Sequence, residues 1–315
     1  MNGHLLRLGD RDPAVVTLKA CLGRAVTPPA PLDTGSEFDA RTRDAVVRFQ
    51  GAQGETPDGI VGPATWALLG RALGYATAMV PALGDVPPWV RNLLLNNPLS
   101  TSLRGLDSAG ALDLYERSSG PLTANQRSGL AFLLDAIRAD AAITDVRCAA
   151  YMLATVKHEC ADRWQPIEEF GKGGGRPYAA AVEVKGSDGK TYSHRYYGRG
   201  YVQLTWDYNY RGMSKQLGMG DALLIHPEKA LDRDIAYRIL SEGMRRGSFT
   251  GKGLGKYIAG DACDYRNARR IINGTDEAER IAGYATRLQT LLLASIPAQH
   301  SMSLGTASAT SPGPM

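Results

Sequence analysis

The sequence predicts a mainly α protein in two units: a small three-helix bundle joined to a larger α-rich (α+β) domain that contains a small β-hairpin. Three observations support this. The length of 315 residues is about twice the ~150 residues typical of one domain. Apolar residues recur at helical spacing in both halves of the chain. Strand-like segments are few, and the clearest pair flanks one glycine-containing turn.

Residues 1–72 are expected to form the small bundle. Asp12-Pro13 is a typical helix start, with Leu18 and Leu22 at the spacing of an apolar helix face. Two later stretches, 38–49 and 60–69, repeat one pattern: an apolar residue, a short turn, a threonine near a helix start and an amphipathic helix. The similarity of these two stretches indicates one three-helix unit rather than a long repeat array.

Residues 73–119 are predicted to be a structured linker, because prolines and glycines interrupt any long helix there. Short helices are expected near Val90–Leu95 and Ala111–Tyr115. At the other end, residues 297–315 are rich in Ser, Ala, Gly, Pro and Thr, which predicts a disordered tail.

The domain over residues 120–296 has the strongest helical signals. Thr123 and Gln126 have the spacing of a capping box, and an apolar face follows them. Further helices are expected over 145–159, 230–245 and 278–296. A hairpin is expected where Val182–Lys185 and Lys190–Ser193 flank a Gly-Ser-Asp-Gly turn.

Composition excludes several classes of protein. The formal net charge is only +4, and the basic excess lies in residues 120–296. This charge is too small to predict a nucleic-acid partner. It is compatible with binding to an anionic polymer such as a bacterial wall. No apolar run approaches the ~18 residues of a membrane span, so no membrane insertion is expected. The N-terminus lacks the apolar region of a signal peptide. We also expect a monomer.

Neither a disulfide scaffold nor a metal site is expected. The four cysteines form no C-x-x-C pair and predict free thiols. The five histidines are scattered, and no H-E-x-x-H motif is present, so no metal and no cofactor are expected.

Glu159 is the first candidate catalytic residue. Cys148, Met152 and Thr155 share its helix face, so the carboxyl closes a mostly apolar stripe. Burial raises a carboxyl pKa, as a general acid near neutral pH requires. The alternative left open is a helix-end glutamate in a salt bridge.

A second carboxylate follows a few residues later. Pro166 is expected to stop the helix, so that Glu168 or Glu169 can face Glu159 across a groove. Two carboxyls about 6.5–9.5 Å apart leave room for a water and give inverting glycoside hydrolysis. Plain solvated surface remains the alternative for both residues.

An aromatic run, YYGRGYVQLTWDYNY, occupies residues 196–210. Aromatic faces stack on pyranose rings, and the interleaved Gln, Thr, Asn and Arg can bond sugar hydroxyls. A buried aromatic strand is an equally good interpretation of this composition.

This run resembles the signature YYGRGPIQLSxNYNY of glycoside hydrolase family 19, which contains chitinases and phage lysozymes. His158-Glu159 and the Ile-Ile-Asn-Gly at residues 271–274 also resemble elements of that family, in the same order. The preceding W-x-P-I-x-E-x-G suggests peptidoglycan-cleaving phage endolysins. Departures from the family pattern are Thr205 for Ser, Asp207 for Asn, and Tyr201-Val202 for Pro-Ile.

The resemblance implies a lysozyme-like catalytic domain with assigned residues. Glu159 would be the general acid, Glu169 the base with Glu168 as the fallback, and Thr205 would hold the attacking water. Further residues would contact the sugars: Glu168, Tyr197, Gln203, Tyr208, Asn209, Arg270 and Asn273.

The N-terminal unit resembles the peptidoglycan-binding module found beside many wall hydrolases. The evidence is Asp58-Gly59-Ile60-Val61-Gly62-Pro63-Ala64-Thr65, with Phe49-Gln50 ahead of it. Asp58-Gly59 fits a turn that needs positive φ.

Together these resemblances imply an endolysin that binds peptidoglycan and cuts the β-1,4 bond between its amino sugars, made in a host cytoplasm and released to the wall by a holin-type factor. A chitinase on the same scaffold, and a catalytically dead wall-binding or virion structural protein, are the alternatives.

Overall fold

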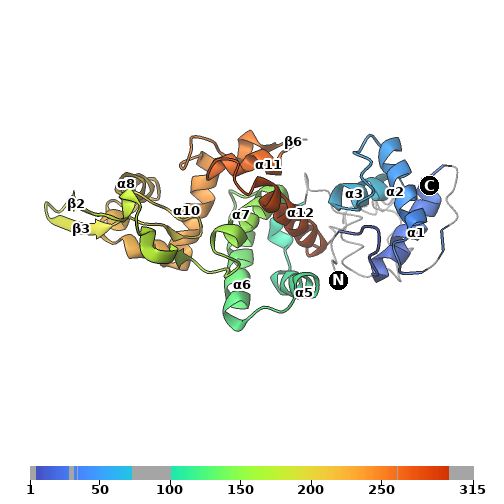
Figure 1. Cartoon of the computed structure of the whole chain (residues 1–315), viewed down its shortest axis with the longest axis horizontal. Coiled ribbons are helices and arrows are strands. Elements are labelled where there is room, and N and C mark those ends of the chain that lie inside the picture. The colour runs from blue at the N-terminus through green and yellow to red at the C-terminus, as the bar shows by residue number, and fades with distance from the viewer. Residues whose placement is uncertain (1–4, 28–31, 34, 73–100, 261, 298–315) are drawn as a thin grey trace, which may run out of the picture.

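The computed structural model describes residues 5–27, 32–33, 35–72, 101–260 and 262–297, and it confirms a mainly α fold (Figure 1). The predicted helix at Val90–Leu95, most of the predicted linker and all but one residue of the predicted tail lie outside these residues. Within the described ranges, no helix is both long enough and apolar enough to cross a membrane. The α-helices are α1 Pro13–Ala25, α2 Ala40–Ala52, α3 Pro63–Ala72, α5 Ser108–Ser119, α6 Ala124–Ala139, α7 Val146–Glu159, α8 Asp207–Gln216, α9 Ala222–Ile225, α10 Arg233–Arg246, α11 Tyr265–Ala268 and α12 Ala278–Ala294.

The N-terminal bundle packs α1, α2 and α3 around one apolar core. Asp12 begins α1 as predicted, because its carboxylate accepts the Ala14 backbone N–H at 2.8 Å. Short antiparallel bridges, including Leu6 with Val61, close the bundle. The largest buried side chains are Phe38, Phe49 and Trp66.

A buried glutamine fixes the turn before α3. The Gln50 amide donates to Asp58 Oδ1 at 2.9 Å, and its carbonyl oxygen accepts the Gly59 N–H at 2.9 Å. Gly59 has φ +70°, which confirms the predicted left-handed turn.

Helix α7 is the central element of the C-terminal domain. Ten of its fourteen residues are buried, and α12 and α10 pack against it (Figure 1). The capping box of α6 is confirmed, with Thr123 and Gln126 bonding reciprocally. Helix α5, which contains the predicted Ala111–Tyr115 segment, packs on α6 and α12. The predicted boundary at residue 120 stays a prediction, and the described residues before it pack with the helices after it.

Small strand pairs and 3-10 helices complete this domain. The hairpin β2–β3 is confirmed, with Val184 opposite Tyr192, and it projects from the end distant from the bundle (Figure 1). The pair β1–β4 joins Ile167 to Gly200 and Glu168 to Arg199. The strands are β1 Ile167–Glu168, β2 Ala181–Lys185, β3 Thr191–Arg195, β4 Arg199–Gly200, β5 Ile258–Ala259 and β6 Ala262–Cys263. The 3-10 helices are η2 Leu103–Gly105, η3 Phe170–Gly173, η4 Pro177–Ala179, η5 Pro227–Leu231, η6 Leu254–Lys256 and η7 Arg269–Ile271.

The chain reversal after α7 does not depend on Pro166, so that prediction is wrong. The helix already ends at Glu159, seven residues earlier. Ala161, Asp162 and Trp164 then adopt positive φ values of 49°, 63° and 58°, and these left-handed residues turn the chain. Trp164 is fully buried at the turn and meets Tyr115 edge-on at 5.5 Å.

The reversal fits against α6 only because residue 129 is glycine. A Cβ on Gly129 would lie 2.0 Å from the Trp164 carbonyl oxygen. We therefore expect Gly129→Ala to lower the free energy of unfolding by at least ~1–3 kcal/mol, as overpacking against backbone does. Denaturant unfolding followed by circular dichroism measures this.

Gly212→Ala is the matched control, because it also lies within a helix, α8, and its added Cβ would meet nothing within 4 Å. It should raise stability by about 0.5–1 kcal/mol through helix propensity. Equal effects of the two substitutions would contradict the packing argument.

Candidate functional site

Glu159 forms a salt bridge, the alternative that the sequence left open. It is the last residue of α7, and its side chain is 16% exposed. The Arg269 guanidinium, itself almost fully buried, donates to Glu159 Oε1 and holds the Asp276 carbonyl at 3.0 Å through Nε. The first candidate carboxylate is therefore paired with a fixed cation.

Glu168 lies in a second charged cluster. The Tyr197 hydroxyl donates to Glu168 Oε1, and Lys172 Nζ lies 3.4 Å from Oε2. The Tyr197 hydrogen bond, followed by Lys172 and Arg199, holds the pKa of Glu168 below its ordinary value, although partial burial opposes the shift. Glu168 is thus set up as an anion at neutral pH.

Glu169 is bonded through both of its carboxylate oxygens. Tyr178 donates to Oε1 at 2.8 Å, and the Gly198 backbone N–H donates to Oε2 at 3.0 Å. The Glu169 N–H in turn donates to the Gly198 carbonyl at 2.7 Å. Side chain and backbone are both tied to the residue just before β4.

One short segment around β4 pairs with Glu168 and Glu169 and contacts Cys160, which follows Glu159 in the chain. The Cys160 thiol, next to Glu159, contacts the carbonyl oxygens of Gly200 and Tyr201 at 3.8 and 3.7 Å. Glu168 pairs with Arg199, and Glu169 with Gly198. Both predicted partners therefore approach the end of α7 through the same strand.

Most of the aromatic run is core, as the alternative interpretation held. Tyr196, Tyr201 and Tyr210 are fully buried. Tyr197, predicted to contact sugar, is buried too; its hydroxyl bonds Glu168 and its ring covers the Arg199 guanidinium at 3.7 Å.

Two aromatic residues of the run remain accessible beside Glu169. Tyr208 is 58% exposed and stacks on Trp206 with ring centroids 5.8 Å apart. Tyr178, which bonds Glu169, meets the same Trp206 ring edge-on at 5.5 Å. These rings form a platform that a pyranose could stack upon.

Three other predicted residues lie in the same neighbourhood. Thr205 is half-buried, and its carbonyl accepts the Asn209 amide at 2.9 Å. The Gln203 amide donates to the Ile167 and Gly200 carbonyls at 3.2 Å each, so it ties β1 to β4.

Arg270 and Asn273 lie on the segment that supplies Arg269. Both are exposed, and the side-chain Oδ1 of Asn273 accepts the backbone N–H of Gly274 at 2.9 Å. Sequence reasoning missed Arg269 and Tyr178. A cation enclosed by Ala268 and Ile271 was the signal for Arg269; nothing in the sequence singles out Tyr178.

Cys148, Cys160 and Cys263 are free thiols, as predicted. Burial raises the pKa of Cys160 and raises that of Cys148 to about 12, so these thiols are unreactive. Among the residues described, no group of three or more His, Cys, Asp or Glu could hold a metal ion.

Comparison with known proteins confirms the N-terminal prediction. Residues 11–69 match the family described as "Putative peptidoglycan binding domain". No curated protein matches the chain.

Among solved structures, three chitinases are similar to this chain. A mutant of chitinase C has 20% identity and a TM-score of 0.35, covering 64% of this chain and 96% of that one. Chitinase C from Streptomyces griseus has 19% identity and a TM-score of 0.34, with 68% and 78% covered. A bacterial family 19 chitinase has 19% identity and a TM-score of 0.31, with 65% and 92% covered. All three TM-scores are low, so the function of this chain has to be argued from the geometry of its own site.

The hydrogen bond from Tyr197 predicts a measurable titration. Removing it in Tyr197→Phe should raise the pKa of Glu168 toward 4.5, the ordinary value. Since the folded-state pKa is lowered, the bond stabilises the fold above the unfolded pKa, and this stabilisation fades as pH falls through the folded pKa. Carboxyl carbon NMR titration measures the shift.

Tyr192→Phe is the matched control, because the Tyr192 hydroxyl bonds Asp188 in the same way and lowers the pKa of that residue. It should raise the pKa of Asp188 and leave Glu168 unchanged. An unshifted Glu168 in Tyr197→Phe would contradict the assignment.

Proposed function

We propose that this protein is a cell-wall glycosidase: it binds bacterial peptidoglycan through residues 11–69 and hydrolyses the β-1,4 bond between the amino sugars, as an endolysin of the muramidase type does. The observation that carries the proposal is that one segment, residues 198–201, contacts Cys160, the neighbour of Glu159, and pairs with Glu168 and Glu169, beside the exposed ring of Tyr208. A carboxylate pair next to a stacking surface is what glycoside hydrolysis requires.

Glu159 is proposed as the general acid that protonates the leaving glycosidic oxygen. Its carboxyl is at the end of a buried helix, so its position is fixed relative to the rest of the domain. After the proton leaves, the Arg269 guanidinium is already in place to stabilise the carboxylate.

The strand register favours Glu169 over Glu168 as the base. Glu169 pairs with Gly198, and the mutual bonds of Arg199 with Leu204 make Thr205 the next residue opposite Gly198. Residues in one row of paired strands project to one face. Glu169 and Thr205 would then lie on either side of Gly198, where the Gln203 side chain occupies the space that a side chain at residue 198 would need.

Glu168 belongs to the neighbouring row, and its oxygens already face Tyr197, Lys172 and Arg199. The proposed reaction is therefore inverting: Glu169 removes a proton from a water oriented with Thr205, while Glu159 protonates the leaving group.

Replacing the acid should separate binding from cleavage. Glu159→Gln should reduce hydrolysis of purified peptidoglycan by about 10²–10⁴, the contribution of a general acid, while retention on wall sacs is unchanged. Clearing of permeabilised cells, together with identification of the new reducing-end sugar, measures cleavage.

Glu183→Gln is the control, because Glu183 lies on the solvent face of the hairpin strand β2. Retained cleavage in Glu159→Gln would exclude this residue as the acid. Products from chitin but none from peptidoglycan would make the protein a chitinase.

The two candidate bases give opposite expectations. Glu169→Gln should lower kcat by about 10²–10⁴, whereas Glu168→Gln should mainly raise KM, since it would remove only a sugar contact. Kinetics on a soluble glycan strand distinguish the two effects. The reverse order would assign the base to Glu168 and would contradict the register argument.

A further inference from the structure

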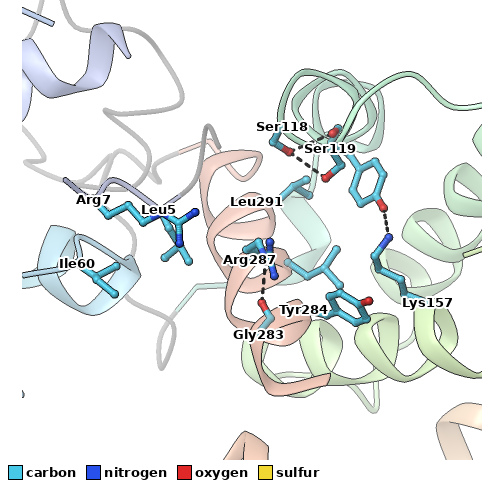
Figure 2. A pocket seen from close by; sticks show the side chains of 12 residues that line it. Leu5, Arg7, Ile60, Ser118, Ser119, Lys157, Gly283, Tyr284, Arg287 and Leu291 are labelled. Carbon is cyan, nitrogen blue, oxygen red and sulfur yellow. Dashed lines mark hydrogen bonds between the residues drawn. The ribbon is translucent and has the colours of Figure 1, made fainter. Parts of the chain in front are cut away.

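A second cavity lies away from the carboxylates, between the N-terminal bundle and the C-terminal domain. Its volume is about 490 Å³, within the ~300–1,000 Å³ typical of small-molecule sites. Leu5, Arg7 and Ile60 line it from the bundle; residues of α5, α7 and α12 line it from the other side (Figure 2). We name this cavity the seam pocket.

The lining of the seam pocket is cationic. Among the lining residues that the structure describes, three carry positive charge, Arg7, Lys157 and Arg287, and none is an Asp or Glu. Lys157 already has partners, since Nζ donates to the Tyr115 hydroxyl at 2.7 Å and to Asp162 at 2.6 Å.

The two arginines have unused donors. Within the described part of the chain, the Arg287 side chain makes one hydrogen bond, from Nε to the Gly283 carbonyl at 3.2 Å (Figure 2). The Arg7 side chain is exposed, and it is the backbone N–H of Arg7 that donates to Asp10. Two guanidiniums from different units are thus free to bind carboxylates in the bidentate geometry that they favour.

The rest of the lining is apolar or aromatic. Leu288 and Leu291 contribute aliphatic surface, the Tyr115 and Tyr284 rings lie around Lys157 at 5.4 and 5.3 Å, and serine hydroxyls complete the rim. A ligand that matches must combine anionic groups with small apolar ones.

We propose that the seam pocket binds the stem peptide of peptidoglycan, a short chain that carries free carboxylates and alanine methyl groups. The choice of a wall peptide as the ligand rests on the proposed function. The cationic lining of the pocket is observed independently of that function. Bridging Arg7 and Arg287, the peptide would hold the bundle against α12.

The seam pocket and the carboxylate cluster lie on different sides of α7. Lys157 and Glu159 are two residues apart, which is a rotation of about 200° around an α-helix. No residue that lines the pocket belongs to the proposed catalytic set. One wall fragment could therefore present its glycan to the carboxylates while a stem peptide occupies the seam pocket.

Calorimetric titration of the full chain tests this with a soluble disaccharide tetrapeptide that is the end product of muramidase cleavage, so that the titration measures binding alone. Arg7→Gln and Arg287→Gln should each weaken its binding about tenfold, as expected for loss of a charge-assisted hydrogen bond. Arg280→Gln is the control, because this exposed arginine of α12 pairs with Glu277 at 3.0 Å and does not line the pocket. Its affinity should equal that of the wild type, and melting temperatures should agree throughout.

Each other outcome overturns the proposal. Wild-type affinity in both variants would show that the peptide does not bind in the seam pocket. An effect of Arg287→Gln alone would show that the peptide does not bridge the bundle and α12. Equal losses with the peptide-free disaccharide would make it a sugar site. Binding of a glycerol phosphate oligomer with the same arginine dependence, without binding of the tetrapeptide, would assign it to a phosphate polymer. Cleavage assays are independent of these titrations, so failure of the proposed function remains distinguishable.

Discussion

The chain reversal between α7 and β1 is the constraint on which the candidate site depends. It returns the chain from Glu159 to Glu168 and Glu169 within ten residues, and Trp164 anchors it in the core. The backbone of Trp164 approaches α6 so closely that only glycine fits at residue 129. Were this reversal relaxed, β1 would lose its pairing with β4, and with it the link that joins the carboxylates.

The three carboxylates differ in the charge of their partners, and this difference suits them to different roles in the proposed reaction. Glu159 has one buried guanidinium beside it, whereas Glu168 is surrounded by a hydroxyl and two cations. Glu169 is bound by two neutral donors, a phenol and a peptide N–H. The lowered pKa of Glu168 makes it the poorer proton acceptor, which agrees with the strand register in favouring Glu169 as the base.

Local signals predicted much of the fold. Asp12, the Thr123–Gln126 box and the hairpin turn all act over a few residues, so their patterns are visible in sequence. The helix end after α7 was attributed to Pro166, because left-handed residues such as Ala161 have no compositional signature. Among the site residues, Glu159 and Glu169 were identified through motifs, but their partners Arg269 and Tyr178 were not. Tertiary packing alone brings these partners together. Arg269 is 110 residues from Glu159, and Tyr178 is nine residues from Glu169.

Backbone strain is concentrated where the carboxylates converge. Of the seven non-glycine residues with positive φ in the described chain, six fall between 161 and 206, and each such conformation costs about 1–3 kcal/mol. Gln203 and Trp206, at φ 53° and 70°, shape the loop that holds Thr205, while the buried Tyr201 and Tyr210 flank it. Strain of this kind persists only where surrounding packing offsets it. The buried half of the aromatic run therefore acts on the site indirectly: it holds a strained loop in place, so that Tyr208 remains exposed beside the half-buried Trp206.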